Sequence, residues 1–289
     1  MKKLLKIDNF ILKIIACITM AFDHVGIFLD MYVGQQVGTL ITAFRIIGRL
    51  AFPIFAFLIV EGALHTKNLK KYLLRIGVMG AAISIFLLVF QYSNLFGAIT
   101  TAQVSNIFLQ FTLCLLTIYF LNLPKFKKLL AIIPFAYVVF VYVSDVVNAP
   151  YMSLYPKAFI PDYGLYGFIF VIGTYLLLKY YLSTVNKVLE EPSKIEAYKE
   201  TAEFQLKYNC FAILPLLILT ALITLFRYTV PYMNTLNVSI QSYALLAAIP
   251  LFFYSGKLGY SNKIVKYGFY GFYPVHIILI WFIFTLIYL

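Results

Sequence analysis

Runs of about twenty apolar residues follow one another along nearly the whole chain. A helix of that length crosses the roughly 30 Å hydrocarbon core of a bilayer, because each residue adds about 1.5 Å. Only 12% of the 289 residues are charged and 63% are hydrophobic, whereas a soluble domain carries about 25% charged residues. The sequence therefore predicts an all-α integral membrane protein, built as a polytopic helical bundle.

Hydropathy divides the sequence into about nine membrane spans. They are expected near residues 10–31, 40–64, 72–92, 104–123, 129–147, 163–183, 208–226, 239–256 and 267–288. Lys and Arg gather between alternate spans, and the opposite loops keep only Lys157 and Arg227. Because basic loops stay in the cytoplasm, the N-terminus is predicted to be cytoplasmic and the C-terminus outside. Residues 1–289 are expected to form a single membrane-embedded domain, with a charged cytoplasmic loop at 184–207 that forms a short helix.

Charge and cysteine usage argue against several other classes of protein. The net charge of +12 comes from short basic clusters between spans, so membrane orientation explains it and no nucleic-acid partner is expected. Cys17, Cys114 and Cys210 stand alone in apolar segments, so neither a disulfide framework nor a metal site is expected. The basic start of the chain continues into an apolar run without a small-residue cleavage site, and we interpret it as a retained first helix.

A small set of ionisable residues lies inside the predicted spans. Ionisable groups at membrane depth cost at least about 2.5 kcal/mol each, and they usually mark a functional site. The set consists of Asp23, His24, Arg45, Arg49, Glu61, His65 and His276.

The first two spans bring four of these residues to one depth. Asp23 and His24 are expected roughly 9 to 11 Å below the outer interface, and Arg45 and Arg49 roughly 7 to 14 Å below it. Consecutive helical residues point about 100° apart, whereas residues four apart share a face. We therefore expect Asp23 to pair with one arginine and His24 to stand free and face a cavity. An ion pair that only locks two helices together, and a histidine bonded to a carbonyl, are the structural alternatives.

His276 is expected near the membrane midplane, two residues after Pro274. Proline frees a backbone carbonyl and can bend a helix beside a cavity. The structural alternative is a core histidine held by Tyr273 or Tyr270.

Residues nearer the inner interface are more ambiguous. Glu61 and His65 lie four apart, which favours a snorkelling or capping pair at a helix end. Lys13 lies about three helical turns before His24, on the same face and about 16 Å away. A basic cluster that includes Lys70, Lys71 and Arg75 sets topology, and it would also suit the phosphates of an anionic cofactor.

At these residues the sequence resembles the TraX family of bacterial membrane proteins. The resemblance is carried by "LKIIACITMAFDHVG" at 12–26, "FRIIGRLAFPIFAFLIVEGALHTKNLKKYLLRI" at 44–76, "DYGLYG" at 162–167, and "QSYALLAAIPLFFYSGKLG" with "KYGFYGFYPVHIILI" between 241 and 280. The family is named for a conjugative-pilus protein that acetylates the N-terminal amine of pilin. It is distantly similar to the acyltransferase-3 family, whose first-helix Lys/Arg and His pattern falls on Lys13 and His24. In that family's second-helix pattern, Glu61 replaces a small polar residue.

The resemblance implies a membrane-bound acetyltransferase in the bacterial cytoplasmic membrane. It would move an acetyl group from cytoplasmic acetyl-CoA to an amine or a hydroxyl at the outer side, and an amine such as the N-terminus of a pilin or another secreted peptide is favoured. His24 would be the general base in direct transfer, because histidine accepts protons near neutral pH. An acetyl-histidine relay with His276 stays open. Arg45 and Arg49 would stabilise the oxyanion or orient Asp23.

The residues expected to bind acetyl-CoA follow from charge and from the same resemblance. They are Lys13, Lys70, Lys71, Arg75, Glu61, His65 and Tyr273. Two other functions are compatible with the buried charges. The first is a transporter or flippase that uses them as a substrate or proton path. The second is a non-catalytic scaffold of an envelope or conjugation apparatus.

Overall fold

A computed structural model describes residues 5–93, 106–148, 157–229 and 240–288. These residues fold almost entirely into helices, and the protein is a helical membrane protein: seven of its described helical stretches are long and apolar enough to cross a membrane. The seven stretches are Asn9–Tyr32, Gly38–His65, Leu69–Val89, Lys125–Ser144, Gly164–Leu189, Ala202–Phe226 and Lys263–Tyr288. Two further apolar helices, Ile107–Leu121 and Ser242–Phe252, are shorter.

Each of the nine predicted spans overlaps one of these helical stretches. The spans predicted at 104–123 and 239–256 are the ones that form only short helices. The first of these has 15 residues, or roughly 22 Å, which is less than the hydrocarbon thickness. Residues 94–105 and 230–239, which precede the two short helices, lie outside the described part of the chain. The membrane orientation stays a prediction.

The chain divides into two compact units. Unit 1 consists of Met1–Leu58 and Leu176–Leu289, and unit 2 consists of Ile59–Tyr175. We describe each unit by itself, and the single membrane domain expected from the sequence stays a prediction.

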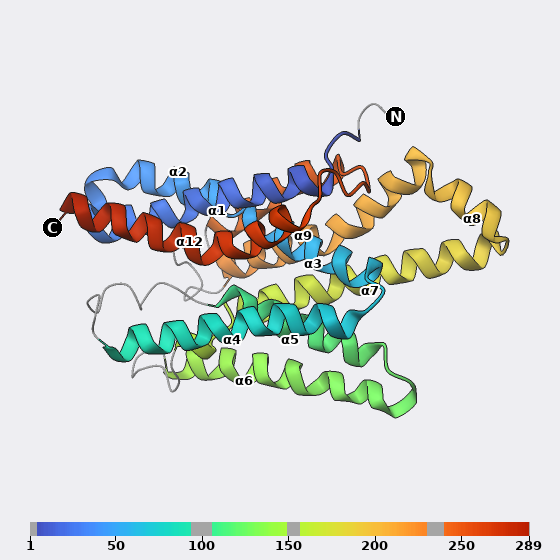
Figure 1. The fold of residues 1–289 in the computed structure, drawn as a ribbon, viewed down its shortest axis with the longest axis horizontal. Helices are drawn as coiled ribbons and strands as arrows, with labels where there is room; N and C mark the ends of the chain where they lie inside the picture. Colours follow the sequence, from blue (N-terminus) through green and yellow to red (C-terminus); the bar gives the residue numbers. More distant parts are fainter. Residues whose placement is uncertain (1–4, 94–105, 149–156, 230–239, 289) are drawn as a thin grey trace. The chain divides into compact units, whose positions relative to one another are not determined.

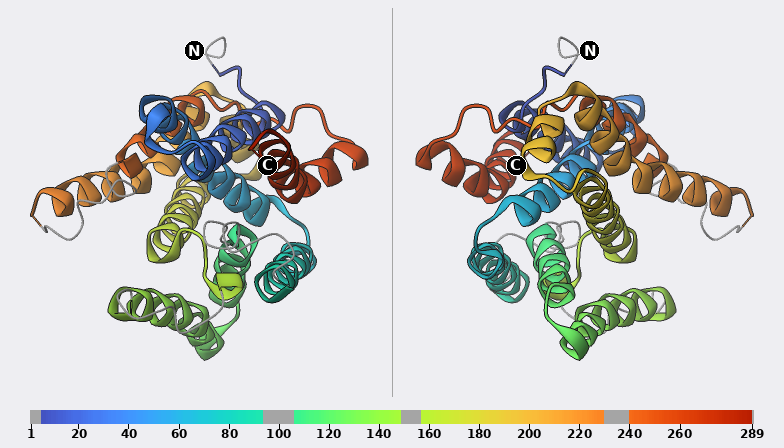
Figure 2. Two further views of the ribbon diagram at one scale, coloured as in Figure 1. Left: turned by 90° about the vertical axis from the view of Figure 1, so that its left-hand side faces the viewer. Right: turned by 90° about the vertical axis from the view of Figure 1, so that its right-hand side faces the viewer.

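Unit 1 is organised around the first helix, α1 (Asn9–Tyr32). Asp8 caps it, because its Oδ1 accepts a hydrogen bond of 2.8 Å from the backbone N–H of Ile11. α1 contacts α2 (Gly38–Gly48) and the last helix, α12 (Lys263–Tyr288), as Figures 1 and 2 show. α1 and α12 are parallel, since ring contacts join their N-terminal ends, Phe10 to Phe269, and their C-terminal ends, Tyr32 to Tyr288.

The rest of unit 1 includes the C-terminal part of α7 (Gly164–Leu189), α8 (Pro192–Lys199) and α9 (Ala202–Thr229). It ends with η5 (Ser242–Ala247) and α11 (Ala248–Phe252), which precede α12. α8 is the short helix predicted within the charged loop at 184–207. Local ion pairs along this loop join Glu191 to Lys194 and Glu196 to Lys199.

The second predicted span is broken into two helices. α2 ends at Gly48 and α3 (Ala51–His65) begins three residues later. In a continuous helix the N–H of residue 53 would donate to the carbonyl of Arg49, but Pro53 has no N–H and its ring would clash with that carbonyl. The turn closes instead with shorter-range bonds, from the N–H of Arg49 to Ile46 O and from that of Leu50 to Ile47 O. The break therefore falls at Arg49, the buried one of the two arginines.

Glycines allow α1 and α2 to approach closely. A Cβ atom added to Gly48 would overlap the side chain of Asp23, so only glycine fits there. A Cβ on Gly26 would lie 3.2 Å from Phe44 Cβ and 3.3 Å from the side chain of Arg45. Small residues at helix crossings are the usual means of close packing in membranes. Here they bring Asp23 against the helix that carries the arginines.

A loop after α11 holds the start of α1 in place. The N–H of Ile7 donates to Phe253 O at 3.2 Å, and that of Ser255 donates to Ile7 O at 2.8 Å. From α9, the fully buried Asn209 donates through Nδ2 to the carbonyls of Phe252 and Tyr254, each at 2.8 Å. This loop thus connects α9 to the beginning of α1.

Unit 2 contains the C-terminal part of α3, α4 (Leu69–Ser93), α5 (Ile107–Leu121), η2 (Lys125–Ala131), α6 (Ile132–Asn148), η3 (Lys157–Phe159) and the beginning of α7. A buried polar network connects three of these elements. Asn106 caps α5 and donates through Nδ2 to Gly80 O and Ser84 Oγ, both at 2.9 Å. Ser84 in turn donates to Ala158 O at 2.8 Å.

Candidate functional site

The first part of the candidate site is an ion cluster between α1 and α2. Arg49 Nη2 donates to both carboxylate oxygens of Asp23, at 2.7 and 2.8 Å. Arg45 Nη1 lies 3.2 Å from Asp23 Oδ1. Asp23 and Arg49 are buried. The sequence predicts that Asp23 pairs with one arginine, but the structure pairs it with both.

The cluster carries one negative and two positive charges, so its net charge is positive. Buried positive groups that are already in place stabilise negative charge that develops nearby during a reaction. Arg49 is held by two further contacts, from Nε to Arg45 O at 3.3 Å and from Nη1 to Gln241 Oε1 at 3.4 Å. Gln241 was not among the predicted residues. In the sequence it is a polar side chain at the start of an apolar run, and this run is one of the stretches that carry the family resemblance.

The second part of the site is a pair of histidines between α1 and α12. His276 Nε2 lies 2.7 Å from His24 Nδ1, and His276 Nδ1 lies 2.7 Å from the backbone carbonyl of Phe272. His276 is buried and His24 is half-buried. The expectation that His24 stands free is therefore wrong, because its Nδ1 is bonded to a histidine from the last helix. The alternative interpretation of His276, a core histidine held by Tyr273 or Tyr270, stays a prediction.

The hydrogen bonds determine the tautomers of the neutral pair. A carbonyl oxygen only accepts, so Nδ1 of His276 carries the proton and donates to Phe272 O. Nε2 of neutral His276 is then an acceptor, and Nδ1 of His24 must be the donor. The lone pair of neutral His24 is consequently on Nε2. This nitrogen is the atom of the pair that can accept a proton from a substrate.

Aromatic rings surround the histidine pair. The ring of Phe272 stacks on that of His276, with centroids 4.7 Å apart and planes 9° apart. Tyr273 lies edge-on to both histidines, with centroid distances of 6.3 Å to His24 and 5.9 Å to His276. Tyr273, which the sequence assigned to cofactor binding, is thus a neighbour of the histidine pair. Further along the two helices, beginning one turn after each histidine, an apolar cluster of Phe28, Ile280 and Phe284 packs between α1 and α12.

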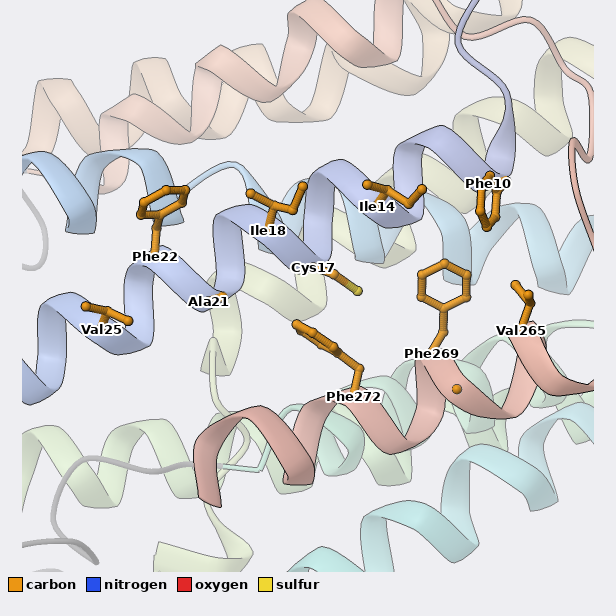
Figure 3. A pocket seen from close by; sticks show the side chains of 11 residues that line it. Phe10, Ile14, Cys17, Ile18, Ala21, Phe22, Val25, Val265, Phe269 and Phe272 are labelled. Atoms are coloured by element: carbon orange, nitrogen blue, oxygen red, sulfur yellow. The ribbon is translucent and has the colours of Figure 1, made fainter. Parts of the chain in front are cut away.

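A groove of about 600 Å³ runs between α1 and α12, and Figure 3 shows its lining side chains. The lining residues are apolar or glycine: Phe10, Ile14, Cys17, Ile18, Ala21, Phe22, Val25, Val265, Gly268, Phe269 and Phe272. Neither histidine is among them. Phe272 connects the two features, since it both lines the groove and stacks on His276. The lining offers no polar side chain for the phosphates or amides of coenzyme A.

Lys13, one of the residues predicted to bind acetyl-CoA, lies beside a residue that lines this groove. It is half-buried, and its Nζ lies 5.5 Å from the ring centroid of Phe269, a cation–π distance. Lys13 and His24 both contact α12, as their spacing on one face of α1 predicts.

The remaining predicted cofactor residues belong to unit 2. Glu61 is buried, and its carboxylate lies 3.7 Å from Nδ1 of the exposed His65 at the end of α3. Nδ1 of His65 is also 3.0 Å from Glu61 O, which is the geometry of a pair at a helix end. Lys70, Lys71 and Arg75 are exposed at the beginning of α4. The guanidinium of Arg75 lies 5.8 Å from the ring centroid of Tyr72.

Comparisons with known proteins give a family and a relative. A family model described as TraX protein matches residues 9–183, which include Asp23, His24, Arg45 and Arg49. A curated relative from Dichelobacter nodosus, named probable fimbrial assembly protein FimC, serogroup H1, is 27% identical over 97% of this chain and 97% of its own length. No solved structure matches the chain.

Proposed function

The chain belongs to the TraX family, and from that premise we propose that it transfers an acetyl group from cytoplasmic acetyl-CoA to an amine at the outer side of the bacterial cytoplasmic membrane. The acceptor we favour is the free N-terminus of a fimbrial or pilin-like subunit. The name of the Dichelobacter relative, which refers to fimbrial assembly, supports this class of acceptor. A hydroxyl acceptor is the second form of the same chemistry.

The hydrogen-bonded histidine pair is the observation that carries the proposal. When a neutral amine attacks the thioester carbonyl, its nitrogen gains positive charge and must lose a proton. His24 Nε2 has the lone pair to accept that proton. Its Nδ1–H, which donates to His276, keeps the imidazole in the required tautomer and stabilises the imidazolium that forms. Collapse of the tetrahedral intermediate releases the CoA thiolate, which takes up the proton.

The ion cluster supports the same step, because its member Asp23 is the residue before His24 on α1. The carbonyl oxygen becomes negative in the tetrahedral intermediate, and a buried cluster of net positive charge stabilises it electrostatically. Asp23 holds both guanidinium groups in place. We assign Arg45 and Arg49 to this stabilisation and Asp23 to positioning them.

The proposal is tested with purified protein in detergent, acetyl-CoA and a peptide with a free N-terminus. Free CoA thiol and acetylated peptide should appear together, and a peptide with a blocked N-terminus should give neither. His24→Ala should lower the rate by about 10² to 10⁴, the usual contribution of a general base. His276→Gln should retain more activity than His276→Ala, because its amide oxygen can accept the Nδ1–H of His24. Gly271→Ala, on the same helix with no atom within 4 Å of the added Cβ, is the matched control.

Two outcomes would overturn the proposal. Wild-type rates in both His24→Ala and His276→Ala would remove the pair from the chemistry. Absence of CoA binding and turnover, together with solute movement across liposomes that His24→Ala abolishes, would identify a transporter.

A further inference from the structure

The groove between α1 and α12 has no role in the chemistry proposed above. Its lining is apolar, and several of the lining side chains are exposed at the protein surface. Ile18 is 51% exposed and Ile14 is 36% exposed. The amides of a pantetheine arm would lose their hydrogen bonds to water there, at about 1 to 3 kcal/mol for each unpaired group. A hydrocarbon chain has no such groups. The lining therefore favours an alkyl chain over coenzyme A.

The length of the groove agrees with one lipid tail. From Phe10 to Val25 the lining residues of α1 span roughly 22 Å of helix. One leaflet of a bilayer contributes about half of a hydrocarbon core of roughly 30 Å. A single acyl chain of a phospholipid would fit within this length, with its headgroup at one end.

Positive charges gather at the N-terminal end of the groove. Lys13 lies beside Phe269, which lines the groove, and Lys266 is three residues before Phe269 on α12. Lys263 and Lys266 are in the first turn of α12, where the helix dipole disfavours cations. Within the described residues, none of these three lysines forms an ion pair with an acidic side chain. These three lysines would attract an anion to this end of the groove.

We propose that the groove is a binding site for an anionic phospholipid, with one acyl chain between α1 and α12 and the phosphate held by Lys13 and Lys266. The bound chain would contact Phe272 and so reach the ring that stacks on His276. The lipid would then hold the Phe272 ring, and through it His276, in place without taking part in the reaction.

Fluorescence quenching by brominated lipids tests this site directly. The chain has a single tryptophan, Trp281, so a Trp281→Phe background allows one new tryptophan to report on one place. Ile14→Trp reports from the groove. Val78→Trp, on a face of α4 that is exposed by 63%, is the control for general lipid contact. Each protein is titrated in mixed micelles with brominated phosphatidylglycerol and, separately, with brominated phosphatidylcholine.

At Ile14→Trp, brominated phosphatidylglycerol should quench at a lower concentration than brominated phosphatidylcholine. The ratio of the two concentrations should be about fivefold for each lysine, because each lysine near an anionic headgroup contributes about 1 kcal/mol. At Val78→Trp the two lipids should quench equally. When Lys13→Gln and Lys266→Gln are added to the Ile14→Trp protein, the ratio between the two lipids should fall close to one. An equal preference at both tryptophans, or one that survives loss of both lysines, would refute the site.

Acetyl-CoA is the competing occupant, and the same assay separates it. If acetyl-CoA restores the fluorescence of Ile14→Trp, the groove binds coenzyme A and the lipid proposal is wrong. Ile18→Trp on the same wall replaces the first reporter if that variant fails to fold. The assay does not depend on turnover, so a failure of the acetyltransferase proposal would leave its result intact.

Discussion

Replacing Asp23 by asparagine should destabilise unit 1 strongly. The substitution keeps the shape of the side chain but removes the negative charge that Arg45 and Arg49 contact. Two charges 4 Å apart interact by about 4 kcal/mol at the effective dielectric constant of a protein site near its surface. The contacts of Asp23 are shorter, at 2.7 and 3.2 Å, although desolvation offsets part of the attraction. Breaking a buried pair from one side costs about 3 to 5 kcal/mol, which we expect for Asp23→Asn.

A double-mutant cycle isolates the part due to the pair itself. Arg49→Gln should cost less than Asp23→Asn, because Arg45 still neutralises the carboxylate. The double variant should be more stable than the sum of the two losses predicts, by about 2 kcal/mol, since residues in one ion network couple by about 0.5 to 3 kcal/mol. Glu203 and Lys207 form the matched surface pair, with side chains 61% and 54% exposed. Their cycle should give a much smaller coupling than that of Asp23 and Arg49, because exposed ion pairs contribute little to stability.

The free energy of unfolding can be measured by titrating folded protein with sodium dodecyl sulfate in mixed micelles. Trp281 packs against the cluster of Phe28, Ile280 and Phe284, so its fluorescence reports on unit 1. Circular dichroism follows the helices in parallel. A coupling energy for Asp23 and Arg49 no larger than that of the surface pair would refute the reasoning, because the buried cluster would then contribute no more than an exposed one.

Other substitutions test further parts of the fold. Gly48→Ala should lower the melting temperature and the transfer rate together, because its Cβ would displace the Asp23 carboxylate, whereas Gly271→Ala should change neither. Asn209→Leu should cost about 2 to 4 kcal/mol in unfolding titrations, since it leaves the carbonyls of Phe252 and Tyr254 without their donor. Asn106→Ala should destabilise unit 2 by a similar amount, while Asn68→Ala, which removes only an exposed cap of α4, should cost about 1 kcal/mol.

The sequence alone predicted the pairing of Asp23 with an arginine, because this contact joins two helices that follow each other in the chain. Asp23 and the two arginines lie on helices joined by a short connection, so depth along each helix was enough to pair them. Helical periodicity also separated Asp23 from His24. The break between α2 and α3 could have been predicted too, because Pro53 removes a hydrogen bond at a known position.

The contact between the two histidines could not be predicted in the same way. His24 and His276 are 252 positions apart, and hydropathy does not determine which helices are neighbours or how each is rotated about its axis. Pro274 indicated that the last helix was unusual, but not that His276 donates to the carbonyl of Phe272. The role of Phe272 was missed for the same reason, since one phenylalanine among many in an apolar helix gives no separate signal.

Asp23 and His24 contact two different helices because consecutive residues of a helix point about 100° apart. Asp23 faces α2 and binds its two arginines, while His24 faces α12 and binds His276. The structural role of the Asp23 ion pair and the catalytic role proposed for His24 are therefore compatible. The ion pair fixes α1 against α2, and this also fixes the rotation of α1 that directs His24 toward α12. Loss of Asp23 should consequently disturb the histidine pair even though the two side chains face different helices.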